Sequence, residues 1–382
     1  MAPEAAPSRG RHGVPMRPFS RPRGALLVFA VLLSSAAAAA EVRIDAPDAW
    51  PAVQAALQSA REHFRRQPGE DFAIRFAAGS FTLAHPGAKA AFDLSGIVPA
   101  NATGHLVIEG QGMERTNLVI AVALHALYGQ DVNHLVVRDL QFSRPGRAVT
   151  QGRVVDVGPD ALTLKLDPGM PVPPALVDDL KIGHWLRKCV VSGADASFPE
   201  EDNDQVAWTD VERLTDATWR FKVLQVGRLR QFRPGDLVAV KSKHGGQAYW
   251  FFKGQDVRFE RLRWLDQSRG VFRGGMSKIA ILDSRIQRRP EPDGSVQCLS
   301  TSDGGPQIGQ PDDPPTSDVL VKGNVFVGTG DDAIALFNAS GVVAGNQVID
   351  SLGRGILLVH SPAVEVKDNV LVRSRLLKQD TR

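Results

Sequence analysis

Cysteine is scarce in this chain of 382 residues, which contains only Cys189 and Cys298. No group of Cys and His residues has the spacing of a structural zinc site, so the sequence indicates no fold of that kind. The two cysteines stand far apart in the sequence, which by itself does not show whether they meet in space. We expect two buried thiols, and a disulfide stays open as the alternative.

Long apolar runs are also lacking beyond residue 40. Within residues 1–40, five arginines precede the apolar run "GALLVFAVLLSS", and "AAAAA" ends before Glu41. This order is typical of a secretory signal peptide. We therefore expect export to the periplasm or the medium, with no membrane attachment after cleavage.

A net charge of either sign is nearly absent once this leader is removed. The leader holds five of the 45 basic residues and one of the 42 acidic residues, so the remainder carries a net charge of −1. A nearly neutral chain has no electrostatic footprint for nucleic acid. No nucleic-acid partner is expected, and the oligomeric state is left open.

Helical periodicity is rare after residue 70, and a repeat takes its place. Several segments share a β-rich run, a small or polar pair and a further apolar residue: "HLVIEGQGM" (105–113), "HLVVRDLQF" (134–142), "DVRFERLRW" (256–264), "KIAILDSRI" (278–286), "DVLVKGNVF" (318–326), "SGVVAGNQV" (340–348) and "AVEVKDNVL" (363–371). In the last five, the seventh residue recurs with a period of about 22 residues and one longer gap. These positions are Leu262, Ser284, Asn324, Asn346 and Asn369.

A period of this length without a Leu-rich consensus predicts a parallel β-helix, in which the three asparagines stack as a ladder. "AWPAVQAALQSAREHF" (49–64) has helical apolar spacing and is expected to cap the open end of the solenoid. The gap between Leu140 and Leu262 is far longer than one coil, which indicates an inserted all-β module.

The chain is therefore expected to have four parts. Residues 1–40 are the signal peptide, and residues 41–144 hold the cap and the first coils. Residues 145–250 are the inserted module. Residues 251–382 hold the coils with the candidate site, and we expect the solenoid to be cut short at Arg382 because no cap follows the last repeat.

The stretch "TGDDAIAL" (329–336) places two carboxylates, Asp331 and Asp332, side by side. A solvated turn is one interpretation of this pair. The other is a catalytic cluster with Asp303, which lies one coil and a short loop earlier. Glycoside hydrolysis needs one carboxylic acid to protonate the leaving oxygen and one carboxylate to activate water, held ~6.5–9.5 Å apart in inverting enzymes.

The chain resembles the pectin-lyase-like superfamily of right-handed parallel β-helices through "AVQAALQSAR", "FAAGSFTL" and "LVIEGQGMERTNLVI". "TSDGG" (301–305) and "TGDDAIAL" are similar to two motifs of the polygalacturonase type of β-helix glycosidase. "LGRGILL" (352–358) takes the place of the third motif, with Arg354 where that family has histidine, and the family's Arg-x-Lys segment has no match. The inserted module and the Asp-Asp motif also resemble inverting α-1,3-galactosidases, although "LFNA" (336–339) replaces the His-Gly of that family.

These resemblances imply an all-β right-handed parallel β-helix with a capping helix and an inserted small all-β module. They imply an exported inverting glycoside hydrolase that acts on galactoside- or galacturonate-type oligo- or polysaccharides without a cofactor. Asp332 would be the general acid, and Asp303 and Asp331 would form the base side that positions water. The sugar, the linkage and exo or endo action stay open.

Three further residues are expected to bind substrate: Arg354, His360 and Trp264. Arg354 is equally well placed as a counter-ion of the aspartate pair. The aromatic residues Tyr249, Trp250, Phe251, Phe252 and Trp264 either stack on a sugar ring or fill the junction between module and solenoid.

Two other functions remain open at this stage. A polysaccharide lyase would use Arg354 or a nearby base, with Ca²⁺ bound by Asp303, Asp331 and Asp332. A non-catalytic β-helix would bind glycans or serve as a scaffold.

Overall fold

The computed structural model describes residues 40–147, 149–173, 184–192, 195–197, 205–241, 246–267, 269–289 and 297–379. Apart from Ala40, the expected signal peptide lies outside these residues. Within them, no helix combines the length and the apolar character needed to cross a membrane.

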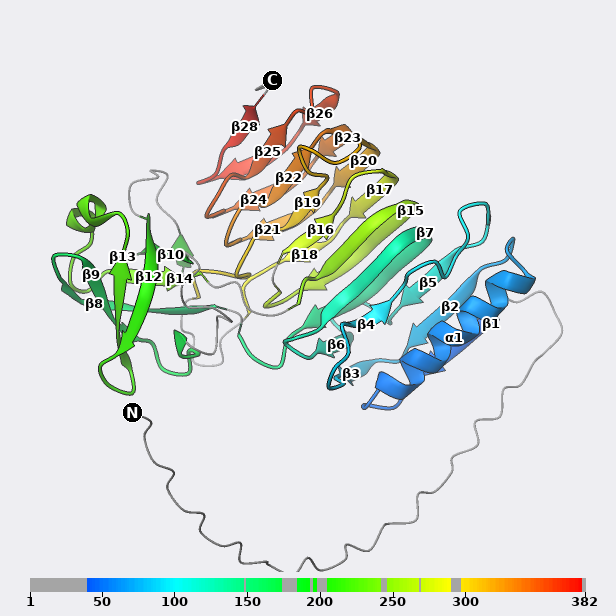
Figure 1. Cartoon of the computed structure of the whole chain (residues 1–382), viewed down its shortest axis with the longest axis horizontal. Helices are drawn as coiled ribbons and strands as arrows, with labels where there is room; N and C mark the ends of the chain where they lie inside the picture. Colours follow the sequence, from blue (N-terminus) through cyan, green and yellow to red (C-terminus); the bar gives the residue numbers. More distant parts are fainter. Residues whose placement is uncertain are drawn as a thin grey trace, which may run out of the picture. The chain divides into compact units, whose positions relative to one another are not determined.

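The larger sheet is a right-handed parallel β-helix, so the predicted fold is confirmed. Its strands pair in parallel from one coil to the next along three faces (Figure 1). The first face contains β1 (Ala40–Ile44), β2 (Phe72–Phe76), β5 (Leu106–Glu109), β17 (Met276–Leu282), β20 (Thr316–Lys322), β23 (Ala339–Ala344) and β26 (Val364–Lys367). The second face contains β3 (Gly79–Leu83), β6 (Thr116–Ile120), β18 (Arg285–Ile286), β21 (Val325–Val327), β24 (Gln347–Ile349) and β27 (Val370–Val372). The third face contains β4 (Ala90–Asp93), β16 (Gly270–Phe272), β19 (Pro306–Ile308), β22 (Ile334–Phe337), β25 (Ile356–Val359) and β28 (Leu376–Gln379).

Two long strands, β7 (His125–Ser143) and β15 (Tyr249–Trp264), pass through all three faces. Each bends where a residue adopts the left-handed conformation, such as His134 (φ 48°) in β7 and Asp256 (φ 58°) in β15. Short polar residues tolerate this conformation better than β-branched ones do, which explains the Asp and Asn residues at the corners.

The interior of the solenoid is filled by every second residue of each strand. Phe259, Ile281, Val321 and Val343 follow one another along the first face and are at most 4% exposed. Burying such a side chain contributes about 1.5–3 kcal/mol, so the stacked coils stabilise one another.

The predicted asparagine ladder is confirmed. The side-chain amide of Asn324 donates to Oδ1 of Asn346 at 2.9 Å, and Asn346 donates to Oδ1 of Asn369 at 2.9 Å. Ser284 continues the ladder, because its backbone N–H donates to Oδ1 of Asn324 at 2.9 Å. The ladder satisfies backbone groups that the turn leaves without a strand partner.

The capping helix α1 (Trp50–Arg66) covers the first coil, as expected. Val53, Leu57, Ala60 and Phe64 form its buried stripe and belong to the same core as the solenoid interior. The helix therefore covers apolar surface that the first coil would otherwise expose to water.

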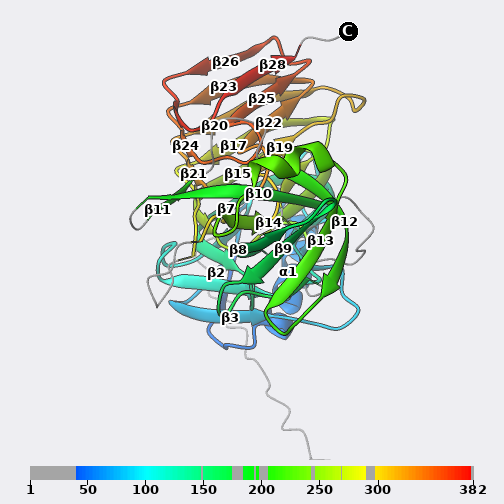
Figure 2. The ribbon, with the colours of Figure 1, turned by 90° about the vertical axis from the view of Figure 1, so that its left-hand side faces the viewer.

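The inserted module is a small closed barrel of antiparallel strands, most of whose members are visible in Figure 2. Strand β10 pairs with both β12 and β14, which closes the ring. Trp208 and Phe221 fill its centre, and a 3-10 helix (Val226–Gln231) adjoins it. The strands are β8 (Thr150–Val157), β9 (Ala161–Leu166), β10 (His184–Ser192), β11 (Asp195–Ser197), β12 (Gln205–Arg213), β13 (Thr218–Val223) and β14 (Leu237–Val240).

The expectation of two free thiols is wrong, because Cys189 and Cys298 form a disulfide. Their Cα atoms lie 6.5 Å apart, within the usual range for a bridge. Cys189 belongs to β10 of the barrel, and Cys298 belongs to the solenoid loop ahead of Asp303. Tertiary packing brings these distant segments together around Leu237, which the local sequence pattern does not reveal.

Candidate active site

The three candidate aspartates lie in turns that precede strands of the third face. Gln307 in β19 pairs with Ala335 in β22, and this register sets Asp303 beside Asp331 on the next coil. The backbone N–H of Gly330 donates to the carbonyl of Asp303 at 3.0 Å. The structure thus brings Asp303, Asp331 and Asp332 together on neighbouring coils, while their catalytic role stays a prediction.

A column of hydroxyl groups holds these turns in shape. Thr301 donates to the carbonyl of Asp303, and Thr329 donates to the carbonyl of Asp331 at 2.9 Å. Ser351, one coil further, also donates to the carbonyl of Asp331, at 2.7 Å. The aspartate backbone is therefore fixed within each turn and, at Asp331, also from the following coil.

Gly353 makes room for the carboxylates of the pair. A Cβ atom at this position would lie 2.5 Å from Oδ1 of Asp332 and 2.8 Å from Oδ1 of Asp331. Both carboxylates therefore gather over one glycine of the next coil. Gly330 is needed for a similar reason, because a Cβ there would lie 2.6 Å from the carbonyl oxygen of Thr301.

Lys241 of the inserted module is a site residue that sequence reasoning missed. It follows β14, its side chain is only 5% exposed, and its Nζ lies 3.1 Å from both Asp303 Oδ1 and Asp331 Oδ2. Burial would lower the pKa of Lys241, but the two carboxylates outweigh burial and raise it. Lys241 thus remains an ammonium ion and cannot serve as a proton-abstracting base near neutral pH.

Arg354 is the counter-ion of Asp332, one of the two roles expected for it. Its backbone N–H donates to Oδ1 of Asp332 at 2.7 Å, and its Nη2 donates to Oδ2 at 2.8 Å. A second arginine, Arg269, approaches Asp303 at 3.5 Å and donates to Gln307 at 3.1 Å. Arg269 was also missed from the sequence.

The two adjacent aspartates have pKa values shifted in opposite directions. Burial and then the charge of Asp331 raise the pKa of Asp332 to about 6, although Arg354 opposes the shift. Partial burial also raises the pKa of Asp331, but Lys241, a hydrogen bond with Asp303 and the charge of Arg354 together lower it below the ordinary value. At pH 5 Asp332 is therefore mostly protonated while Asp331 is ionised.

The carboxylates do not fit the calcium ion of the lyase alternative. Ca²⁺ takes six to eight oxygen ligands at 2.3–2.6 Å. Here the ammonium group of Lys241 lies between Asp303 and Asp331, and Arg354 occupies both oxygens of Asp332. A cation bound among these oxygens would have to displace both positive side chains.

Two hollows meet at Asp331. One of about 190 Å³ lies between barrel and solenoid and is lined by Trp185, Lys241, Gly353 and Arg354 among others. A smaller one of about 40 Å³ is lined by Arg269, Asp303, Gln307, Asp331, Asp332 and Ala335 among others. The cluster can therefore be reached from solvent on two sides.

Trp264 does not contact this cluster, so its prediction as a substrate-binding residue is corrected. It is 5% exposed and stacks on Phe142 inside the solenoid, with ring centroids 4.3 Å apart. Tyr249 and Phe251 also point inward and do not fill the junction with the module. Trp264 follows Leu262 by two residues, and residues two apart in a strand face the same side.

Trp250 and Phe252 alternate with these residues and are partly exposed. Their rings lie 5.8 Å apart, and Trp250 pairs in register with Tyr128 on the preceding coil. The same column continues from Trp250 through Val271 to Gln307, which lines the smaller hollow. Tyr128, Trp250 and Phe252 thus form an aromatic strip on the third face, which also carries the aspartate cluster. Trp250 lies about 10 Å from Gln307, since two strand spacings separate these two residues.

His360 lies one coil after Asn338 and adopts the left-handed conformation (φ 49°). Its backbone N–H donates to the carbonyl of Gln379 at 3.1 Å. It follows β25 (Ile356–Val359), whereas Arg354 precedes this strand. His360 therefore lies at the opposite end of the strand from the cluster.

The sequence matches no profile of a known protein family and no curated protein. Among solved structures, the catalytic domain of a GH87 α-1,3-glucanase variant in complex with tetrasaccharides is similar to this chain, with a TM-score of 0.35 and 12% identity over 89% of this chain and 45% of that chain. This chain thus spans less than half of that chain. The A-module of the mannuronan C-5 epimerase AlgE4 from Azotobacter vinelandii is similar with a TM-score of 0.30 and 10% identity, over 87% of this chain and 77% of that chain.

Proposed function

We propose that the protein is an exported glycoside hydrolase whose active site is the cluster of Asp303, Asp331 and Asp332. The observation that carries this proposal is the pair of adjacent carboxyl groups with pKa values shifted apart. Two carboxyl groups with different protonation states are what acid–base cleavage of a glycosidic bond requires. Export is supported by the leader-like residues 1–40.

Asp332 is the proposed general acid. Its carboxyl group is mostly protonated below pH 6, and its side chain is 11% exposed and lines the smaller hollow. A substrate hydroxyl or carboxylate that binds Arg354 would draw the guanidinium away from Asp332. Because Arg354 lowers the pKa of Asp332, such binding would raise this pKa further and favour the protonated acid.

Asp303 is the proposed base in an inverting reaction. The Oδ1 atoms of Asp331 and Asp332 lie 2.8 Å and 2.5 Å from the point where a Cβ atom on Gly353 would stand. These two oxygen atoms are therefore closer together than the ~6.5–9.5 Å that separates the carboxyl groups of an inverting pair. Asp303 lies one coil away from Asp332 and borders the same hollow. Asp331 then has an electrostatic role, since its charge helps to raise the pKa of Asp332.

The proposed substrate is a galactoside- or galacturonate-type glycan long enough to cross several coils. Three observations support an extended substrate: the hollows on both sides of Asp331, the outward aromatic strip of Tyr128, Trp250 and Phe252, and the two arginines at the cluster. Aromatic faces stack on sugar rings, and a guanidinium group can bind a uronate carboxylate.

The test is a screen of the purified mature protein against α-linked galactosides and pectic oligosaccharides, with release of reducing ends as the readout. The proposal expects cleavage by the wild type and at least a hundredfold slower cleavage by Asp332→Asn. Products with an unsaturated sugar would establish a lyase. Binding without cleavage on any substrate would establish a glycan-binding protein and overturn the proposal.

A further inference from the structure

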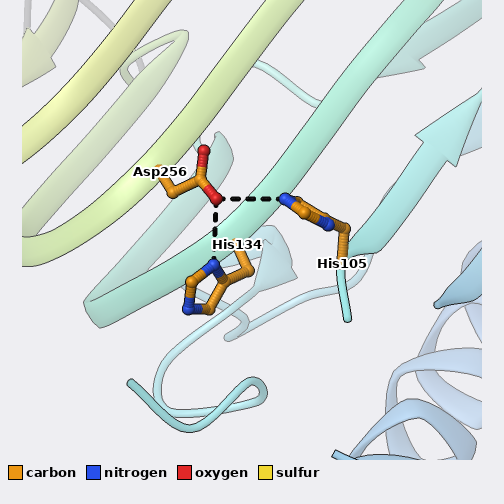
Figure 3. Close-up of side chains that lie close together, drawn as sticks. All are labelled: His105, His134 and Asp256. Carbon is orange, nitrogen blue, oxygen red and sulfur yellow. Dashed lines mark hydrogen bonds and ion pairs between the residues drawn. The ribbon is translucent and has the colours of Figure 1, made fainter. Parts of the chain in front are cut away.

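A second group of ionisable side chains lies at the corner before the first face, away from the aspartate cluster. Successive coils place Asp71, His105, His134 and Asp256 at the same position, one residue before paired strand residues. Figure 3 shows the two imidazole rings converging on the Asp256 carboxylate from neighbouring coils. The proposed hydrolysis uses none of these residues.

The geometry of the group is compact. Oδ2 of Asp256 lies 3.0 Å from Nε2 of His105 and 3.0 Å from Nδ1 of His134. These three atoms all lie within 4.8 Å of one another, and the side chains are between 12% and 33% exposed.

The remaining ring nitrogens also face acceptors. Nδ1 of His105 lies 3.6 Å from Oδ1 of Asp71, and Nε2 of His134 lies 3.4 Å from the carbonyl oxygen of Ala100. A neutral imidazole has one N–H donor and one lone pair, so it cannot donate to acceptors on both sides. A cation on the side of Asp256 would take the lone pair of each neutral ring there and leave its N–H directed toward Asp71 or Ala100.

We propose that His105, His134 and Asp256 bind a divalent transition-metal ion, of which zinc is the best match. Two imidazoles and one carboxylate are ligands that zinc accepts, at about 2.0–2.2 Å. Tetrahedral bonds of that length separate ligand atoms by roughly 3.3 Å, so the two 3.0 Å contacts to Asp256 would open slightly. The two histidine nitrogens, which lie within 4.8 Å of each other, would move to the same separation. Water would complete the coordination.

The residues behind the ligands fit this assignment. A metal-bound histidine usually donates its other N–H to a carboxylate or a backbone carbonyl, which are the roles of Asp71 and Ala100 here. A hollow of about 450 Å³ adjoins the cluster, since it is lined by Asn133 and Gln255, the residues that precede His134 and Asp256. Lys278 occupies the next position of the column and is exposed, so the site ends at Asp256.

The site would join coils that are distant in the sequence. His134 lies in β7, before the inserted barrel, and Asp256 lies in β15, after it. An ion that binds only the folded arrangement stabilises it by mass action. Zinc would therefore hold together the two coils between which the barrel is inserted.

The test is zinc titration of the mature, tag-free protein at pH 7.5 after treatment with a chelator, followed by calorimetry and thermal unfolding. We expect one equivalent of zinc to bind and to raise the Tm, and cobalt to give the absorption of a tetrahedral site. His134→Gln and Asp256→Asn should each weaken zinc binding by tenfold or more. Asp71→Asn should weaken it by about tenfold without changing the stoichiometry.

His85→Gln is the matched control, because His85 stacks on Trp50 far from the group and should leave zinc binding unchanged. Wild-type protein that binds no zinc would overturn the proposal. Unchanged zinc binding in both ligand variants would also overturn it. If one variant fails to fold without metal, His105→Gln provides the same comparison.

Discussion

Replacing the proposed acid with its amide, Asp332→Asn, should change both the rate and its dependence on pH. The wild-type carboxyl group has a pKa of about 6, so activity that needs the protonated acid is present below this value and is lost as the pH rises through it. At pH 7 about one tenth of the molecules retain the proton, and the rate should be about tenfold below its plateau. The asparagine variant has no such titration and should lack this loss.

The size of the effect should depend on the leaving group. Glycosides with poor leaving groups need protonation, and the variant should cleave them slower by a factor of about 10² or more. Aryl glycosides with activated leaving groups need little protonation and should lose much less. Initial rates of both substrate types across the pH range measure this directly.

The structure also provides a control for this experiment. Asp318 lies at a corner of the first face in the left-handed conformation (φ 55°), which asparagine tolerates. Asp318→Asn should therefore keep the wild-type pH profile. If Asp332→Asn lost equal activity on both substrate types, or kept the loss near pH 6, Asp332 would not be the general acid.

Three further variants test other parts of the site. Lys241→Met should destabilise the fold by about 3–5 kcal/mol because Asp303 loses a buried counter-ion, which chemical unfolding measures. Lys188→Met, which breaks a partly exposed barrel ion pair, should cost only about 0–1 kcal/mol, and an equal loss for both variants would disprove the buried counter-ion. Gly353→Ala should lower kcat by a factor on the order of 10², since its Cβ would push on both carboxylates of the pair, and a normal rate would disprove the crowding argument. Trp250→Ala should raise KM for long oligosaccharides about two- to tenfold and leave short substrates unaffected, and an equal change for both would remove the aromatic strip from the substrate path.

The fold could be predicted because the repeat of short β-rich segments is visible in the local sequence. Each coil repeats one β-rich pattern, and the asparagines mark the same turn on three coils. The neighbourhood of Asp303, Asp331 and Asp332 followed from the same register, since one coil in the sequence is one strand spacing in space.

Other features depend on tertiary packing and were missed for that reason. Lys241 and Cys189 belong to the barrel and reach the solenoid only when the two pack together. No pattern in the local sequence indicates that the barrel packs against the solenoid. By contrast, the inward position of Trp264 could have been found from its spacing to Leu262.

The sequence also contains a signal for the three proposed metal ligands. "HLVIEGQGM", "HLVVRDLQF" and "DVRFERLRW" begin with His105, His134 and Asp256, at the same register position of the repeat. In a parallel β-helix, equal register means stacking on neighbouring coils. Extending the register argument from asparagines to ionisable residues would have predicted this group.

The most direct measurement of the central claim is cleavage of an active oligosaccharide in water labelled with heavy oxygen, with mass spectrometry of the products. Hydrolysis by the aspartate cluster adds the oxygen of one water molecule to each broken glycosidic bond. The account predicts one heavy oxygen atom per bond cleaved, and loss of this product in Asp332→Asn. Cleavage without label incorporation would show an elimination reaction and contradict the account.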